Sequence, residues 1–432
     1  MPMNIRTRLS VMMFLQYAFQ GIWIIPLGAY LNKVGFSGEQ IGSIYSTAAL
    51  GFIIAPFFVG MIADRFFSAQ KVLGVTNILA AILLFLASKM AVSPAGNPQP
   101  VVFWWILLAH CICYTPSWAL TNTIALNQMS DPGRQFPGIR VLGTIGWIVV
   151  STASLFSRQI TEAVGYADNI ELTRLPMIIG SGIGLAAGLF AFVLPSTPPK
   201  VTEHKTTFAD ILGVKALKLL KDRNFAIFAA CSFLILFPGM FYWAFCNVFL
   251  NELQMPAAMF KQSMGQMAEL VFLLIMPFFF ARFGVKKMLL VGMLAWIARF
   301  ICFSFGDLGS MVFLLYLGLL LHGVCFDFFF VTGQLYTDKK APKEVQAAAQ
   351  GLISFITFGL GWLIGALLAG SVVGKYVTLT NEKAIPIMHN WHVIWMYPAV
   401  MALVITVVFC IFFKDDVIVG STENTRLKTA KT

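Results

Sequence analysis

Long apolar segments alternate with short polar segments along the whole chain. Each apolar segment has roughly 20 residues or a few more, which is the length that an α-helix needs to cross the hydrocarbon core of a bilayer. The pattern therefore predicts a chain of transmembrane helices. We place twelve of them, at 10–31, 41–63, 72–91, 101–126, 138–157, 175–195, 224–250, 263–281, 287–305, 309–335, 347–372 and 393–413.

Prolines lie inside several of these segments. Helix interiors in water rarely tolerate proline, whereas neighbouring helices in a membrane bundle can satisfy the carbonyl groups that it frees. The prolines thus favour a membrane bundle over a soluble helical protein. They are Pro26, Pro56, Pro116, Pro238, Pro277 and Pro398.

The longest internal polar stretch separates the first six segments from the last six. We therefore predict a bundle over 1–195, a cytoplasmic linker over 196–223, a second bundle over 224–413 and a cytoplasmic tail over 414–432. Apolar positions of the linker share one side, which predicts a helix along the membrane surface. These positions are Phe208, Ile211, Leu212, Leu219 and Leu220.

The composition excludes an ordinary soluble protein. Hydrophobic residues make up 58% of the 432 positions, charged residues 11%, and the mean hydropathy is +0.80. A typical soluble domain has about 25% charged residues. So few charges exclude a cytosolic enzyme, a disordered protein and a secreted module.

The basic residues predict the orientation. The chain carries 30 Lys and Arg against 19 Asp and Glu, a net charge of +11. With both termini in the cytoplasm, 22 basic residues fall in cytoplasmic segments and 7 in outer segments. Cytoplasmic loops of membrane proteins carry this excess, so the charge requires no nucleic-acid partner. We expect a multi-pass protein of the bacterial inner membrane.

The sequence lacks the residue patterns of common enzymes. The seven cysteines show no CxxC pair or Cys/His spacing, and Walker, HExxH and serine-elbow motifs are absent. We therefore expect no enzyme activity, no metal and no cofactor. ATP-driven transport and membrane hydrolysis lose ground accordingly.

Three polar residues share one face of the fifth segment. Arg140, Thr144 and Trp147 follow the i, i+4, i+7 spacing of a helix face. Arg140 either extends to the cytoplasmic surface or faces a hydrated cavity, and its two neighbours favour the cavity. There a guanidinium can hold a carbonyl or ribose oxygen, or a carboxylate.

Two carboxylates lie deep inside predicted segments, where charge is expensive. Glu269, with Gln266 one turn before it, either joins two helices as a neutral acid or binds substrate or proton. Asp327 is surrounded by phenylalanines, including Phe326, and burial among them favours the uncharged acid. Proton coupling needs such a group. His322 either relays protons or is a core histidine.

On three further segments, polar and aromatic residues share one face of the predicted helix. They can serve either as contacts between helices or as contacts to a planar ligand. They are Gln16, Gln20 and Trp23 on the first segment, Thr115, Trp118 and Asn122 on the fourth, and Tyr242 and Asn247 on the seventh. We interpret Arg299, in the ninth segment, as structural, either extending to the outer surface or paired with Asp307.

The sequence Gly60-x-x-x-Asp64-Arg65, followed by Lys71, resembles the motif between the second and third helices of the major facilitator superfamily. The resemblance implies twelve helices in two six-helix bundles related by an axis along the membrane normal. It also implies that Asp64 braces the cytoplasmic face. The family's second glycine and second basic residue are less well kept.

Four further strings resemble the nucleoside:proton symporters of that superfamily. They are FPGIRVLGTIGW (Phe136–Trp147), QMAELVFLLIMPFF (Gln266–Phe279), HGVCFDFFF (His322–Phe330) and AAAQGL (Ala347–Leu352).

The resemblance implies a cavity that binds a nucleoside through Gln266 and Glu269, with Asp327 and Glu269 coupled to protons. Its lining is implied to include Arg140, Thr144, Gln266, Glu269, Phe326 and Asp327.

The chain departs from the well-known carriers at several positions. Met240 and Trp243 replace polar residues, His322 replaces a tyrosine and Trp147 a phenylalanine. These changes retain a site for a flat ligand and alter the polar contacts that the site makes with the edge of that ligand.

We therefore expect an all-α, monomeric, proton-coupled importer of nucleosides, or of a related ribosylated or glycosylated compound, working by alternating access. Substrate contacts are expected from Arg140, Thr144, Trp147, Gln266, Glu269, Phe326, Asp327, His322, Tyr242 and Gln20. A sugar symporter, a drug-efflux antiporter and a membrane sensor without turnover remain as alternatives.

Overall fold

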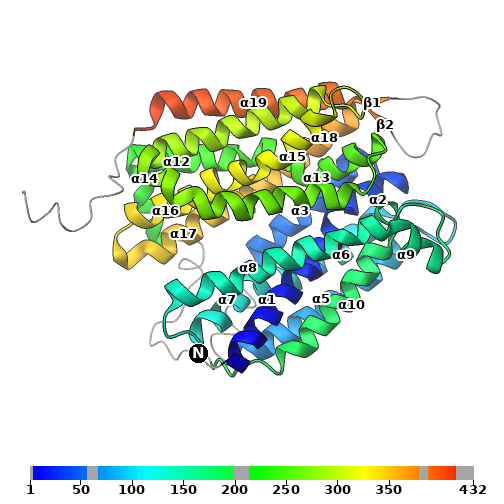
Figure 1. Ribbon diagram of the computed structural model, residues 1–432, viewed down its shortest axis with the longest axis horizontal. Coiled ribbons are helices and arrows are strands. Elements are labelled where there is room, and N and C mark those ends of the chain that lie inside the picture. Colours follow the sequence, from blue (N-terminus) through cyan, green and yellow to red (C-terminus); the bar gives the residue numbers. More distant parts are fainter. Residues whose placement is uncertain (1–2, 56–66, 199–213, 379–387, 415–432) are drawn as a thin grey trace, which may run out of the picture.

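The computed structural model describes residues 3–55, 67–198, 214–378 and 388–414. Figure 1 shows two groups of nearly parallel helices, one built by residues before the linker and one by residues after it. The groups meet at the end that carries α2, α9 and the β1–β2 hairpin. This arrangement confirms the major facilitator fold predicted from the sequence.

Prolines interrupt helices of the first half where the sequence places them. Pro26 separates α1 from α2, and Pro116 begins α7 directly after α6, because proline has no N–H to donate to the preceding turn. The helices of this half are α1 (Met3–Ile24), α2 (Leu27–Lys33), α3 (Gly38–Ala55), α5 (Ala69–Met90), α6 (Pro100–Tyr114), α7 (Pro116–Asn127), α8 (Pro132–Ser151), η2 (Thr152–Phe156), α9 (Ser157–Ala163), η3 (Ile170–Leu172) and α10 (Leu175–Ala191).

The second half contains the same kinds of interruption and two π-helices. Gly284, at φ 69° and ψ −177°, breaks the 48-residue α14 into the predicted eighth and ninth segments. The elements are α12 (Arg223–Leu234), α13 (Leu236–Glu252), α14 (Ala258–Phe305), α15 (Val312–Phe326), η5 (Asp327–Val331), α16 (Thr332–Lys340), η6 (Lys343–Val345), α17 (Gln346–Ser354), η7 (Phe355–Gly361), α18 (Trp362–Lys375), β1 (Val377–Thr378), β2 (Met388–His389) and α19 (Trp391–Phe412).

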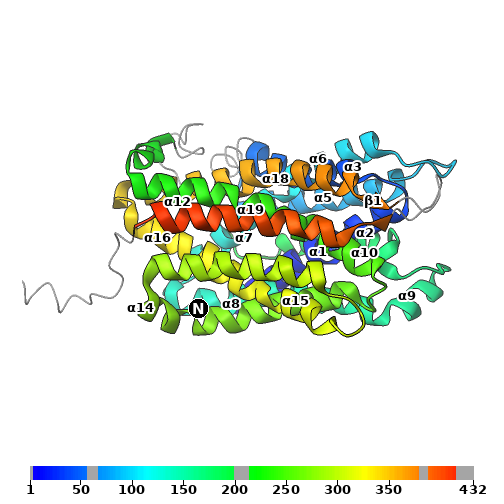
Figure 2. The same ribbon diagram turned by 90° about the horizontal axis from the view of Figure 1, so that it is seen from above.

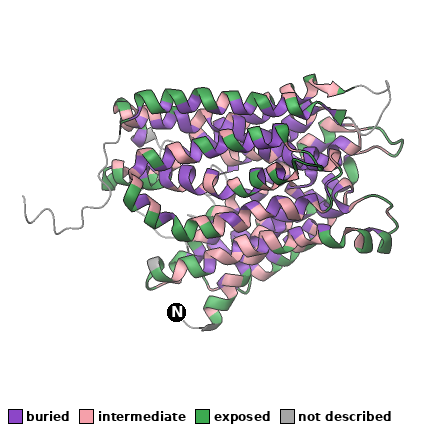
Figure 3. Cartoon of the chain, turned by 45° about the horizontal axis from the view of Figure 1, so that its top comes forward, coloured by how far each residue is buried: buried purple, intermediate pink, exposed green. Residues whose placement is uncertain are grey.

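The helical surface is that of a membrane protein. Leu274, Phe278 and Ile411 expose 81%, 66% and 65% of their area. Water would penalise so much exposed apolar surface, whereas lipid does not. Figure 3 shows the exposed positions on the outer sides of the helices and at their ends, around a buried interior. The twelve predicted segments each correspond to helix within the described residues.

The described part of the linker belongs to the second half. The 3₁₀-helix η4 (Val214–Lys221) contacts α17, and its Leu219 and Leu220 pack near Ala349. Phe208, Ile211 and Leu212 lie outside the described residues, as does the motif Gly60, Asp64 and Arg65.

The two halves approach most closely where α3 meets α18. A Cβ on Gly42 would overlap the carbonyl oxygen of Ala366 and lie 2.7 Å from Cα of Gly370, and a Cβ on Gly370 would lie 2.7 Å from the oxygen of Gly38. Figures 1 and 2 show the two helices side by side. Small residues permit such contact between membrane helices.

We expect Gly42→Leu to separate α3 from α18. Overpacking typically costs about 1–3 kcal/mol, and no nearby flexible side chain can move aside for the added atoms. Thermal unfolding in detergent checks this result. Gly182→Ala is the control, because nothing lies within 4 Å of a Cβ there. An unchanged melting temperature for Gly42→Leu would contradict the tight contact.

Candidate functional site

The two predicted intramembrane carboxylates lie close enough to interact electrostatically. Asp327 is the first residue of the π-helix η5 and is 1% exposed, and its Oδ2 has no hydrogen-bond partner among the described residues. Glu269 is half-buried on α14. Two carboxylates in a dry environment cannot both be charged without a large penalty, so this pair is suited to holding a proton.

A cation from the first half faces these carboxylates. Arg140 on α8 acts electrostatically on Glu269, and α8 contacts α14. The Arg140 guanidinium carbon lies 4.3 Å from the ring centroid of Tyr17, which stacks at 6.2 Å on Trp118. The charged cluster of Arg140, Glu269 and Asp327 therefore joins both halves. Tyr17 lies one residue from Gln16 and was not among the residues predicted from the sequence.

A π-helix begins at Asp327, beside this cluster. One additional residue per turn shifts the side chains that follow, and such bulges are frequent at functional sites. A Cβ on Gly292 of α14 would lie 2.9 Å from the backbone nitrogen of Phe329, so only glycine allows η5 to pack this close. The sequence pattern gave no sign of the π-helix.

A second polar cluster consists of Gln266, His322, Arg299 and Tyr242. The Gln266 amide nitrogen lies 3.3 Å from His322 Nε2, and Arg299 Nη1 lies 3.1 Å from His322 Nδ1. The Arg299 guanidinium carbon lies 3.2 Å from the ring centroid of Tyr242. Tyr242 and Arg299 are fully buried. In this conformation Tyr242 therefore makes a cation–π contact with Arg299 inside the core.

The predicted environment of Arg299 is wrong. It is 0% exposed, so it does not extend to the surface, and Asp307 instead accepts hydrogen bonds from the backbone N–H groups of Gly309 and Met311. Arg299 is surrounded by aromatic rings, whose negative faces can hold a cation. Aromatic residues close to Arg299 in the sequence, such as Trp296 and Phe303, could have indicated these aromatic surroundings.

The remaining predicted contacts lie at the interface of α1 and α8 or near Asp327. Trp147 packs against Gly21, where a Cβ would lie 2.9 Å from its ring. The Nε1 of Trp147 and the Oε1 of Gln20 have no partner among the described residues. Thr144 is half-buried on α8, and Phe326 contacts the His322 ring at 5.9 Å.

Other polar stripe residues hold helices together. Gln16 donates to Ser117 Oγ at 2.6 Å and accepts from Asn77 at 2.8 Å. Asn247 donates to Glu171 at 2.8 Å. These bonds favour the interpretation of Gln16 and Asn247 as contacts between helices.

Two positions where the chain departs from the carriers it resembles, Met240 and Trp243, lie on α13. Trp243 stacks on Trp362 at 5.5 Å with parallel planes, and the Trp362 indole donates to the carbonyl of Tyr45 at 3.1 Å. Met240 is fully buried in the core. Trp243 thus adds to the aromatic surface between the halves, and Met240 contributes only packing.

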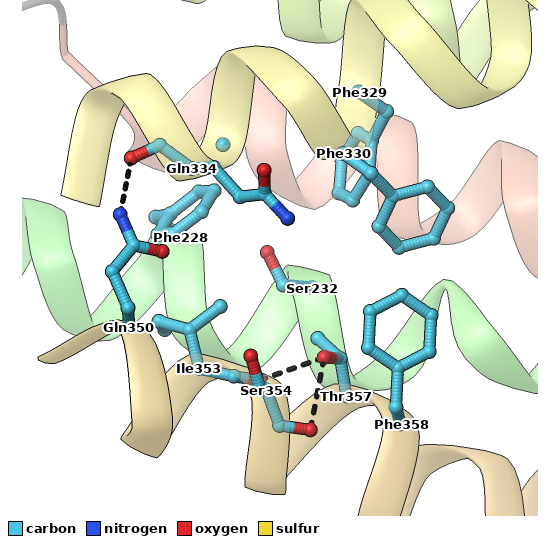
Figure 4. A pocket seen from close by; sticks show the side chains of 11 residues that line it. Phe228, Ser232, Phe329, Phe330, Gln334, Gln350, Ile353, Ser354, Thr357 and Phe358 are labelled. Atoms are coloured by element: carbon cyan, nitrogen blue, oxygen red, sulfur yellow. Dashed lines mark hydrogen bonds between the residues drawn. The ribbon is translucent and has the colours of Figure 1, made fainter. Parts of the chain in front are cut away.

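A small hollow, partly open to solvent, adjoins the π-helix within the second half. Figure 4 shows Phe329 and Phe330 of η5 on one side of it and Gln334 and Ser354 near the other. Gln334 and Ser354 are exposed, whereas Ser232 is buried and its hydroxyl has no partner among the described residues. The hollow therefore leads from solvent toward the segment that begins with Asp327.

Glu171 fastens the two halves together at the end where α3 meets α18. It lies on η3 of the first half and accepts hydrogen bonds from three groups of the second: Asn247 Nδ2 at 2.8 Å, the Met259 N–H at 2.9 Å and Asn251 Nδ2 at 3.2 Å. Burial raises the pKa of Glu171, and these hydrogen bonds oppose the shift.

A second carboxylate acts at the same end. Glu252 of α13 accepts from Asn32 of α2 at 3.1 Å, from the Trp391 indole at 2.6 Å and from the His389 backbone at 3.0 Å. The Phe260 N–H also donates to Ser154 across the halves at 3.0 Å. The end with α2, α9 and the hairpin is therefore closed by hydrogen bonds as well as by the packing of helices.

Comparison with known proteins identifies the class that this fold and charged cluster define. The family model described as nucleoside H⁺ symporter matches residues 3–417. The chain belongs to this family, and it is a multi-pass membrane transporter rather than an enzyme.

Individual relatives match over almost the full length. YegT of Escherichia coli (strain K12) is 43% identical over 96% of this chain and 95% of its own. The xanthosine permease of the same organism is 32% identical over 95% and 96%. The crystal structure of the nucleoside transporter NupG superposes with a TM-score of 0.82 at 29% identity, covering 95% of this chain and 100% of that one.

We expect Glu171→Ala to open the closed end. The change leaves three donors of the second half without their acceptor, and each costs about 1–3 kcal/mol when buried unpaired. Spin labels at the exposed loop residues Ala167 and Ser310 should report a longer distance by double electron–electron resonance. Glu162→Ala is the control, because Glu162 pairs with Arg158 at the surface. Equal distances in both variants would contradict the role of Glu171.

Closure should also depend on pH. The closed form has the raised Glu171 pKa, and in the open form water restores a value near 4.5. The closed form thus binds the proton more tightly, so lowering the pH toward 4.5 favours closure and raising it favours opening. The same label pair measures this shift. Glu171→Gln should abolish the part of the pH dependence that Glu171 causes. If the distance between the labels varies with pH in this variant as it does in the unmodified protein, Glu171 is not the titrating group.

Proposed function

We propose that this protein imports nucleosides into the bacterial cytoplasm together with protons, by alternating access. The observation that carries the proposal is the charged cluster of Arg140, Glu269 and Asp327, which joins the two halves of a chain in the nucleoside H⁺ symporter family. The names of the xanthosine permease and of NupG support nucleosides as the substrate class.

The substrate lies between the halves, next to this cluster. Arg140 and Thr144 of α8 face Gln266 and Glu269 of α14, and their donors and acceptors suit hydroxyl and carbonyl groups. Phe326 and Trp147 supply flat apolar surface for a base or sugar ring. Gln20 completes the site from α1 with a side-chain oxygen that has no partner among the described residues.

Asp327 and Glu269 couple transport to the proton gradient. A proton shared by the pair relieves the repulsion between them, and Arg140 then balances the remaining negative charge. With substrate bound, the cluster is neutral overall, so the halves can rock around it at low electrostatic cost. Loss of the proton on the cytoplasmic side restores the repulsion and favours release.

The distribution of basic residues supports placing both termini in the cytoplasm. The end closed by Glu171 and Glu252 is then the periplasmic end, and this conformation faces inward. The hollow beside η5 lies on the route from Asp327 to the cytoplasm, and its polar rim of Gln334 and Ser354 can hold water for proton release.

Asp327→Asn should abolish accumulation driven by a pH gradient and retain binding. The amide has the shape of the acid and cannot release a proton. Uptake of radiolabelled uridine into proteoliposomes, with and without an imposed gradient, measures this effect. Asp338→Asn is the matched control, because Asp338 is exposed at the end of α16. Gradient-driven accumulation by the Asp327 variant would refute the coupling role.

The substrate class requires a test of its own. Thermal shifts of the purified protein with nucleosides, nucleobases, monosaccharides and cationic drugs should be largest for nucleosides, and uptake of the best ligand should follow. Stabilisation by sugars alone would favour a sugar symporter. Resistance to cationic drugs on expression would favour an efflux antiporter, and binding without accumulation a sensor.

A further inference from the structure

Arg299 is a fully buried cation without an ion pair in the described part of the chain. It is 0% exposed, and its Nε and Nη2 have no hydrogen-bond partner there. The ring of Tyr242 lies 3.2 Å from its guanidinium carbon, and the rings of Trp296 and Phe303 lie at 5.3 and 5.7 Å. Cation–π attraction therefore holds Arg299 in one place, which leaves Nη1 directed at His322.

The bond between Arg299 and His322 fixes the imidazole tautomer. A guanidinium remains protonated in proteins and has donors only. Because Nη1 lies 3.1 Å from His322 Nδ1, that nitrogen must offer a lone pair. The His322 ring proton is then on Nε2. An imidazolium would direct a second N–H at Arg299, so His322 is neutral in this arrangement.

The tautomer in turn fixes the orientation of the Gln266 amide. His322 Nε2 now carries a proton and needs an acceptor, yet it lies 3.3 Å from the amide nitrogen of Gln266, which is also a donor. The Gln266 oxygen has no partner among the described residues. Amide orientations are assigned from the hydrogen-bond network. Rotating the amide by a half turn pairs the oxygen with His322 and frees the NH₂ group.

The backbone makes this relay rigid. A Cβ on Gly265 of α14 would lie 2.8 Å from Cβ of His322 on α15, so these two helices are as close as glycine permits. The His322 ring also stacks on Tyr242 at 5.3 Å. The rings of His322 and Tyr242 cannot turn without displacing Arg299.

We propose that Arg299 is a positioning residue for substrate specificity: through His322 it obliges Gln266 to present its NH₂ group to the ligand. This inference rests on the proposed function, in which Gln266 contacts the nucleoside. The ligand must then place a hydrogen-bond acceptor there, either a base carbonyl or a ribose oxygen. A base with an amino group at that point is rejected, because donor would face donor.

The tautomer can be measured without any substrate. In ¹⁵N spectra of protein labelled at its five histidines, His322, assigned by its loss in His322→Gln, should show a pyridine-type Nδ1 and a protonated Nε2. A protonated Nδ1, or an imidazolium at neutral pH, overturns the proposal. This experiment uses the unmodified Arg299 and stands even if variants at Arg299 fold poorly.

A double-mutant cycle tests the relay to the ligand. Arg299→Met should weaken inosine binding roughly tenfold, the usual effect of losing one hydrogen bond. In a Gln266→Leu background the same change should have no further effect, because Arg299 acts through Gln266. Arg282→Met is the control, an exposed arginine of the same helix. Independent, additive losses overturn the proposal.

Ligand pairs identify the acceptor. If Gln266 reads the base, Arg299→Met should reduce the preference for inosine over adenosine, which carries an amino group in place of the carbonyl. If it reads the sugar, the preference for inosine over 2′-deoxyinosine should fall instead. No change in either preference overturns the proposal. By contrast, a Gln266→Leu variant that binds inosine normally refutes the proposed site itself and leaves the tautomer result standing.

Discussion

The halves of this transporter meet backbone to backbone where α3 crosses α18, and the position of Arg140 in one half relative to Glu269 and Asp327 in the other depends on that contact. Gly38 and Gly42 lie against Gly370 so closely that no side chain fits between them. The buried carboxylate of Glu171 adds three hydrogen bonds across the same end. A junction of this kind closes one side of the charged cluster and allows the opposite ends to separate.

Charges inside the bundle are stabilised in two different ways. Glu269 interacts with Asp327 of its own half and with Arg140 of the other half, so the charge balance changes whenever the halves move or a proton arrives. Arg299 instead lies among aromatic rings of a single half, and its surroundings do not depend on the motion of the halves. The first arrangement suits coupling, whereas the second suits permanent positioning of neighbouring side chains.

Sequence reasoning found the helices and the two carboxylates because a bilayer allows few alternatives. A segment without charge spans it, and a carboxylate inside a span stands out. The same reasoning failed for Arg299, because the choice between surface, ion pair and aromatic surroundings depends on which helices become neighbours. It also missed Glu171, which looks like an ordinary loop residue until the asparagines of α13 are brought beside it.

The sequence by itself determined the class of protein and its helical segments, and it predicted an orientation and the residues able to carry a proton. Those properties follow from local hydropathy, from charge and from recognisable strings. The tertiary structure decided which end is closed, that η5 is a π-helix at Asp327, and that His322 lies between Arg299 and Gln266. These depend on distances between residues far apart in the chain, which no local pattern specifies.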